Sequence, residues 1–205
     1  MNVKRIKQLE ARFLSRYNDG FDSDEMKEIR KKHNLSKLVD YIHNVCSEEN
    51  LKQGLNIFFD VTKIISKSSM VSVFEKMRFR DLVKEFDNNE KILFLEAIYN
   101  LLHLDEELGF NQLVDMLAPY KLAKWPIITC FRAYYNMNYD VFVKPTTVKK
   151  IIKFIELQDI VYTPKVNYEF YVKYREYINE MKKHVENSIK PSNPAFSGFL
   201  MITIE

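Results

Sequence analysis

Residues 123–129 read Ala-Lys-Trp-Pro-Ile-Ile-Thr, and residues 141–147, beyond an aromatic stretch, read Val-Phe-Val-Lys-Pro-Thr-Thr. Proline is favoured in the first turn of a helix, so Pro126 and Pro145 each predict a helix start. The chain's only tryptophan lies directly before the first of these prolines. We interpret the two runs as a constrained surface that brackets one helix.

Apolar residues recur at helical spacing on both sides of this stretch. The 205 residues are 46% hydrophobic, enough to bury a core, and include only 4 glycines and 6 prolines. Sandwiches and barrels need more turns than so few glycines and prolines supply. We therefore expect an all-α, orthogonal or bundle-like domain of about nine or ten helices. One domain over 1–205 is expected, with 1–118 and 119–205 as its lobes if it divides.

Charge is distributed unevenly along the chain. The net charge of +3 is too small to indicate a nucleic-acid partner by itself. Residues 85–115 are acidic, with Lys91 as their only cation, whereas residues 144–183 carry nine cations against five carboxylates. An anionic partner is therefore expected at the C-terminal half.

Several function classes are disfavoured by what the sequence lacks. Cys46 and Cys130 lie far apart without Cys-x-x-Cys spacing, which predicts free thiols and a reducing compartment. No uncharged apolar run reaches the roughly 18 residues of a membrane span. Histidines occur singly, and phosphate-loop and hydrolase motifs are missing. We expect a cytoplasmic protein with no metal, no cofactor and no membrane partner.

The leading candidate site is the start of the helix expected after Pro145. Hydroxyls, first-turn amides and lysines are grouped there, and together they can hold a phosphate or a nucleic-acid backbone. The alternative is that one threonine caps the helix and the lysines form a solvated face. The candidate residues are Lys144, Thr146, Thr147, Lys149, Lys150 and Lys153.

Two further clusters combine charge with aromatic residues. Over residues 162–177, tyrosines alternate with Lys173 and Arg175 and can stack bases, although their helical spacing favours core packing. Over residues 74–81, a helix face is expected to join one arginine to two carboxylates in an ion-pair network. A substrate pocket of an enzyme of unknown class is the alternative function, lined by Glu75, Arg78, Arg80, Trp125 and Arg132.

The apolar segment from Phe196 to Ile204 is expected to be a short, β-prone tail. Such a tail must be covered either by the chain's own core or by another subunit. A scaffold that forms homo-oligomers through this tail is therefore a third functional interpretation.

Three segments together resemble a widespread bacterial family of uncharacterised all-α proteins. They read FLSRYNDGF from Phe13, FEKMRFRD from Phe74, and KWPIIT with FVKPTT from Lys124 and Phe142. In that family a proline usually precedes the glycine of the first segment, where this chain has Asn18-Asp19. The resemblance implies one folded unit and supplies no activity, cofactor or site residue.

A more distant likeness is to helical DNA-repair glycosylases, which are also all-α and basic at one end. Those enzymes generally carry a glycine-rich helix-hairpin-helix loop before a catalytic aspartate. Here Gly20, Gly54, Gly109 and Gly198 are isolated from one another. The leading hypothesis is therefore a non-enzymatic binding module for an anionic partner, with nucleic acid as the favoured class.

Overall fold

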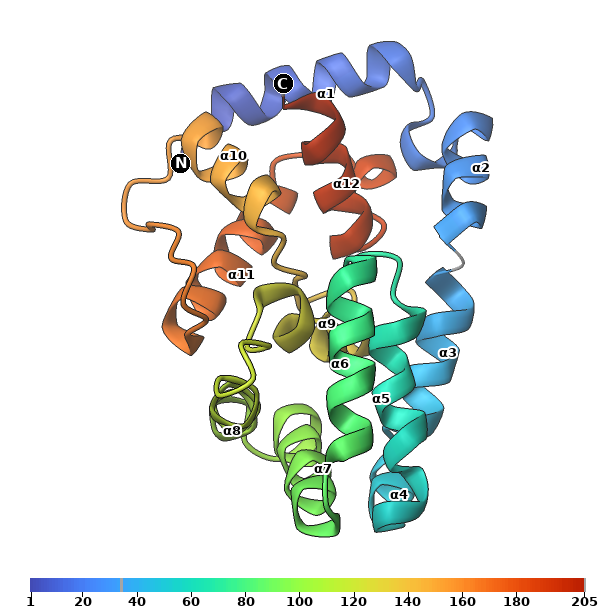
Figure 1. The fold of residues 1–205 in the computed structure, drawn as a ribbon. Coiled ribbons are helices and arrows are strands. Elements are labelled where there is room, and N and C mark those ends of the chain that lie inside the picture. The colour runs from blue at the N-terminus through green and yellow to red at the C-terminus, as the bar shows by residue number, and fades with distance from the viewer. Residues whose placement is uncertain (34, 205) are drawn as a thin grey trace.

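The computed structural model describes residues 1–33 and 35–204, without the side chains of residues 30, 32 and 33. This part of the chain contains twelve α-helices and no β-strand, which confirms the all-α fold (Figure 1). The α-helices are α1 (Val3–Arg16), α2 (Asp24–His33), α3 (Leu35–Val45), α4 (Glu48–Leu51), α5 (Phe58–Lys67), α6 (Val73–Glu85), α7 (Asn88–His103), α8 (Glu106–Leu117), α9 (Trp125–Tyr135), α10 (Pro145–Ile155), α11 (Tyr168–Lys182) and α12 (Asn193–Thr203). Three 3-10 helices accompany them, η1 (Gly20–Asp22), η2 (Gly54–Ile57) and η3 (Asn187–Ile189).

The helix count exceeds the expected nine or ten for two local reasons. Gly54 adopts a positive φ of 64°, so the apolar run around it splits into α4, η2 and α5 instead of forming one helix. The predicted β-prone tail was wrong, because residues 193–203 form α12. The Ser192 hydroxyl caps that helix by accepting a hydrogen bond from the Ala195 amide at 3.3 Å.

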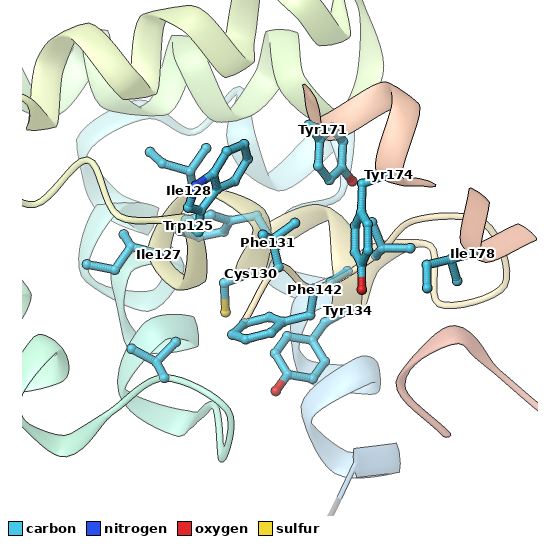
Figure 2. Packing of buried hydrophobic residues seen from close by; sticks show 14 of the residues in the cluster. Trp125, Ile127, Ile128, Cys130, Phe131, Tyr134, Phe142, Tyr171, Tyr174 and Ile178 are labelled. Atoms are coloured by element: carbon cyan, nitrogen blue, oxygen red, sulfur yellow. The ribbon is translucent and has the colours of Figure 1, made fainter. Parts of the chain in front are cut away.

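Helix α9 lies at the centre of the molecule. Its residues from Trp125 to Phe131 are all buried, and Figure 2 shows side chains of this segment among other buried residues. The helix packs against α3, α5, α7 and α8. The interpretation of this stretch as a surface was therefore wrong. A helix that is apolar on every side is buried on every side, and the proline only sets where it starts.

The buried apolar residues form one cluster that extends from Ile6 to Ile204. Helix α9 belongs to the second expected lobe, yet it packs against helices of the first. The tyrosines of α11 contribute to the same core, as the helical spacing favoured, with Tyr171 and Tyr174 buried beside Phe110 and Phe170. The core thus joins both halves of the chain.

The two ends of the molecule are built from different parts of the sequence. Helices α1, α10 and α12 meet at one end, and α7 and α8 pack together at the other (Figure 1). Gly109 lets α8 approach α7 closely, since a Cβ at this position would overlap the backbone of Leu101 and Ala97. None of the helices described combines the length and apolarity of a membrane span.

Candidate functional site

The leading candidate site lies at the N-terminal end of α10. Lys144 is the N-cap residue, and its side chain makes no capping hydrogen bond. Neither Thr146 nor Thr147 caps the helix, which corrects the alternative interpretation of these threonines. Pro145 has no amide hydrogen, so the donors of the first turn are the two threonine amides, at the positive end of the helix dipole.

The structure brings four of the six predicted residues together around one cavity of about 160 Å³. On the α10 side, the first turn and Lys150 contribute polar or cationic side chains. The apolar lining comes from Ile151 of α10 and from residues 200–204 at the end of α12. A small anion with an apolar neighbour group fits this combination of charge and surface. The lining residues are Lys144, Thr146, Thr147, Lys150, Ile151, Leu200, Met201 and Ile204.

The two remaining predicted lysines lie on the other side of α10. Lys149 and Lys153 line a more open cavity of about 530 Å³ together with Tyr162. The Lys149 ammonium lies 4.9 Å from the centroid of the Tyr162 ring, a cation–π distance. The six candidate residues therefore occupy two adjoining faces of one helix and not one pocket.

The lysines of this helix carry uncompensated charge. Within the described part of the chain, none of Lys144, Lys149, Lys150 and Lys153 forms an ion pair. Glu156, the C-cap residue of α10, is already paired with Arg5 of α1 at 2.9 Å. The four lysines therefore face solvent without an ion-pair partner among the described residues.

Helix α1 extends this cationic surface, which the sequence interpretation missed. It contains Lys4, Arg5, Lys7, Arg12 and Arg16 against Glu10 as its only acid. Arg5 donates to the Phe154 carbonyl of α10 at 2.6 Å, and Arg12 donates to the Thr203 carbonyl of α12 at 2.9 Å. The charge imbalance of α1 was visible in the sequence, but its place beside α10 was not.

Acidic residues gather at the opposite end of the molecule. Most acids of the stretch predicted to repel phosphate lie on α7, α8 and the turn between them, while Glu85 is the last residue of α6 and Asp87 is the N-cap of α7 (Figure 1). We define the cationic surface by the exposed or half-buried cations of α1 and α10: Lys4, Arg5, Lys7, Arg12, Arg16, Lys144, Lys149, Lys150 and Lys153.

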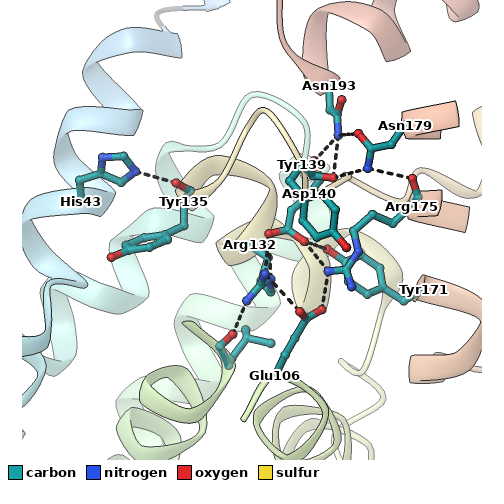
Figure 3. A network of polar contacts seen from close by, with 11 residues as sticks. His43, Glu106, Arg132, Tyr135, Tyr139, Asp140, Tyr171, Arg175, Asn179 and Asn193 are labelled. Carbon is teal, nitrogen blue, oxygen red and sulfur yellow. Dashed lines mark hydrogen bonds and ion pairs between the residues drawn. The ribbon is translucent and has the colours of Figure 1, made fainter. Parts of the chain in front are cut away.

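The second group of charged residues is a buried ion network between α8, α9 and α11 (Figure 3). Asp140 is fully buried and holds Arg132 at 2.8 Å and Arg175 at 2.6 Å. Glu106 pairs with the same two arginines, at 3.2 Å and 2.5 Å. The Tyr171 hydroxyl donates to Asp140 at 3.0 Å. Two cations and two carboxylates thus balance each other.

Burial and neighbouring charges together set the pKa of Arg132 and of Tyr171 in this network. Burial alone would lower the pKa of Arg132, but Asp140 and Glu106 outweigh burial and raise it. Burial also raises the pKa of Tyr171 well above its usual value, and the Asp140 charge adds to this. The arginines therefore stay charged and the phenol neutral, as a structural role for the network requires.

The five residues of the predicted enzyme pocket each use their polar atoms on a different partner. Glu75 forms a capping box with Ser72, so the expected network with Arg78 and Asp81 does not form. The partners of the other four are the Tyr120 carbonyl for Arg78, Asp81 for Arg80, the Thr163 carbonyl for the indole of Trp125, and Asp140 with Glu106 for Arg132.

No protein-family model, curated protein or solved structure matches this chain.

Proposed function

We propose that this protein is a binding module for a phosphate polyanion, with nucleic acid as its partner, and that the cationic surface of α1 and α10 carries the contact. The observation behind this proposal is the set of four α10 lysines that form no ion pair in the described structure. Phosphate backbones are bound mainly by lysine and arginine side chains and by first-turn helix amides.

The arrangement of charges supports the same partner. The acids of α7 and α8 other than Glu106, which is paired with Arg132 and Arg175, lie at the far end of the molecule, so a polyanion is attracted to one end and repelled from the other (Figure 1). Tyr162 lies beside Lys149 and offers a partly exposed aromatic face. A ring next to a cation is the combination on which unpaired bases stack.

Fluorescence anisotropy with labelled single- and double-stranded DNA and RNA tests the proposal directly. We expect binding that weakens steeply with salt, and we expect Lys149→Glu/Lys150→Glu to abolish it. The neutral variant Lys149→Gln/Lys150→Gln loses two lysine–phosphate contacts. On duplex DNA, the slope of the logarithm of the binding constant against the logarithm of the salt concentration should therefore become shallower by about 2.

The matched control is Lys37→Glu/Lys84→Glu, which changes net charge equally but alters exposed residues of α3 and α6. It should retain binding. If both double variants lose affinity to the same degree, net charge and not the surface of α10 determines binding, and the proposal fails. It also fails if the wild-type protein binds none of the four probes at low salt.

The cellular location that we propose is the cytoplasm. Cys46 and Cys130 are both free and fully buried. Free thiols persist in a reducing compartment, and a cytoplasmic module has access to nucleic acid. This location is a proposal that fluorescent tagging and fractionation can test.

A further inference from the structure

Three lysines near the C-terminal end of α11 and the end of η3 line an open cavity that the cationic surface does not include, and two of them, Lys182 and Lys190, carry the argument below. Lys182 is the last residue of α11, and Lys190 directly follows η3. The cavity has a volume of about 470 Å³, and its other lining residues are Asn179, Lys183, Asn187 and Pro191. It is a shallow depression that is wide open to solvent, so a phosphate group with a small attached moiety has direct access to it.

The ammonium group of Lys182 is held in place by neutral acceptors only. It donates to the Asn193 side-chain oxygen at 2.6 Å and to the Asn138 carbonyl at 3.1 Å. Asn193 is fully buried, and its amide nitrogen donates to the Tyr139 and Asp140 carbonyls, which fixes its oxygen toward Lys182. Two of the three ammonium donors are used, so one remains for a ligand.

Lys190 lies near Lys182 without any acid between them. Its ammonium donates to the Lys182 carbonyl at 2.8 Å, and neither lysine forms an ion pair with a described residue. Of the acids nearest in sequence, Glu180 pairs with Lys183 at 2.6 Å and Glu186 accepts from Ser188, and neither forms an ion pair with Lys182 or Lys190 in the described structure. Burial and the charge of Lys190 together lower the pKa of Lys182.

A helix C-terminus accounts for one lysine here, since a cation near the last carbonyls stabilises the helix. Lys190 fills this role by donating to the Lys182 carbonyl, and the Lys182 ammonium donates to Asn193 and Asn138, so two cations without a carboxylate partner share one cavity. We propose that the Lys182–Lys190 cavity binds the phosphate group of a small molecule, either inorganic phosphate or a phosphate monoester. Lysine ammoniums act as point charges suited to a doubly charged, tetrahedral oxyanion, whereas planar carboxylates favour arginine.

Isothermal titration calorimetry with inorganic phosphate and with glycerol phosphate, at constant ionic strength in chloride, tests this site. Lys190→Gln should weaken both affinities by at least about tenfold, the usual effect of losing a charged hydrogen bond. Lys173→Gln, a change on the same helix outside the cavity, should leave them unchanged. Tighter binding of one of the two probes identifies whether the free or the esterified ion is the natural source.

A second measurement avoids reliance on variants that fold poorly. Amine acylation followed by mass spectrometry should show Lys182 and Lys190 protected by phosphate, while Lys173 stays equally reactive. Equal phosphate affinity in wild type and Lys190→Gln, or absence of protection at both cavity lysines, overturns the site. Because Lys190→Gln should leave nucleic-acid anisotropy unchanged, failure here is distinguishable from failure of the α10 surface.

Discussion

Asp140 holds together three helices that are distant in sequence. It lies after α9, accepts from Arg132 of that helix, and accepts from Arg175 and Tyr171 of α11, while Glu106 of α8 closes the network. A buried charge in such a network is stabilised only by its partners, so removing it leaves two arginines with too little negative charge. The sequence gives little sign of this network, because two of its paired members, Glu106 and Arg175, are 69 residues apart.

Asp140→Asn should therefore lower the free energy of unfolding by about 3 kcal/mol, as expected for one member of a buried ion pair. Urea denaturation followed by circular dichroism measures the change. Asp115→Asn removes an exposed acid of α8 and should change stability by less than about 0.5 kcal/mol. Similar effects of the two substitutions would show that the network contributes little.

The two cysteines give a second prediction for single residues. Burial raises the pKa of Cys130 to about 12 and raises that of Cys46 further. Both thiols are therefore protonated at pH 8, and the thiolate is the reactive form. An aromatic disulfide reagent should modify them only as fast as the protein opens, and urea should accelerate the reaction. Fast modification of the native protein at pH 8 would contradict the burial of these groups.

Helix packing gives predictions at two glycines that look alike in the sequence. Gly109 of α8 lies against the backbone of α7, whereas a Cβ at Gly198 of α12 meets open space. Gly109→Ala should lower unfolding free energy by about 2 kcal/mol through overpacking, and Gly198→Ala should raise it by up to about 1 kcal/mol through helix propensity. Thermal melts of the pair measure both, and a neutral Gly109→Ala would refute the close approach of α7 and α8.

Helix α12 decides between the two expectations for the apolar tail. Phe196, Phe199 and Leu200 are fully buried in the chain's own core, while Met201 stays half exposed. Deletion of residues 196–205 should therefore unfold the protein, as judged by loss of a cooperative melt. A folded truncated protein with a smaller oligomer mass would instead support the interface interpretation.

The elements also show what the sequence could and could not establish. Helix starts at Pro126 and Pro145 were predictable because the preference of proline for the first helical turn is a local effect. The tail failed because β-propensity competes weakly with a serine cap and apolar residues at helical spacing. The prediction that α9 lies at a surface was wrong because Trp125 and Pro126 indicate where the helix begins and do not indicate which helices pack around it.

At the scale of the whole molecule, charge is separated along its length. Counting charged residues predicts that the C-terminal half of the sequence is basic. The contribution of α1 to the cationic surface depends on two contacts, whose residues are 149 and 191 positions apart in the sequence. No local pattern reports such contacts. The α10 part of the cationic surface could therefore be predicted from the sequence, whereas the α1 part could not.

Charge separation predicts how the protein behaves on an ion exchanger. Although its net charge is only +3, it should bind a cation exchanger at pH 7 through one end of the molecule. Lys149→Glu/Lys150→Glu should elute at clearly lower salt than Lys37→Glu/Lys84→Glu, despite equal net charge. Coincident elution of the two variants would show that no local cationic surface dominates.

The docking of α1 on α10 and α12 also has a consequence for synthesis. Its apolar face, with Ile6, Leu9 and Phe13 fully covered, leaves the ribosome before either partner helix exists. Until residues 193–203 emerge, this amphipathic helix has no native surface to cover it, and chaperones recognise such segments. Closure of the fold is therefore a late event, and a nascent chain stalled before α12 should remain sensitive to protease within its first helix.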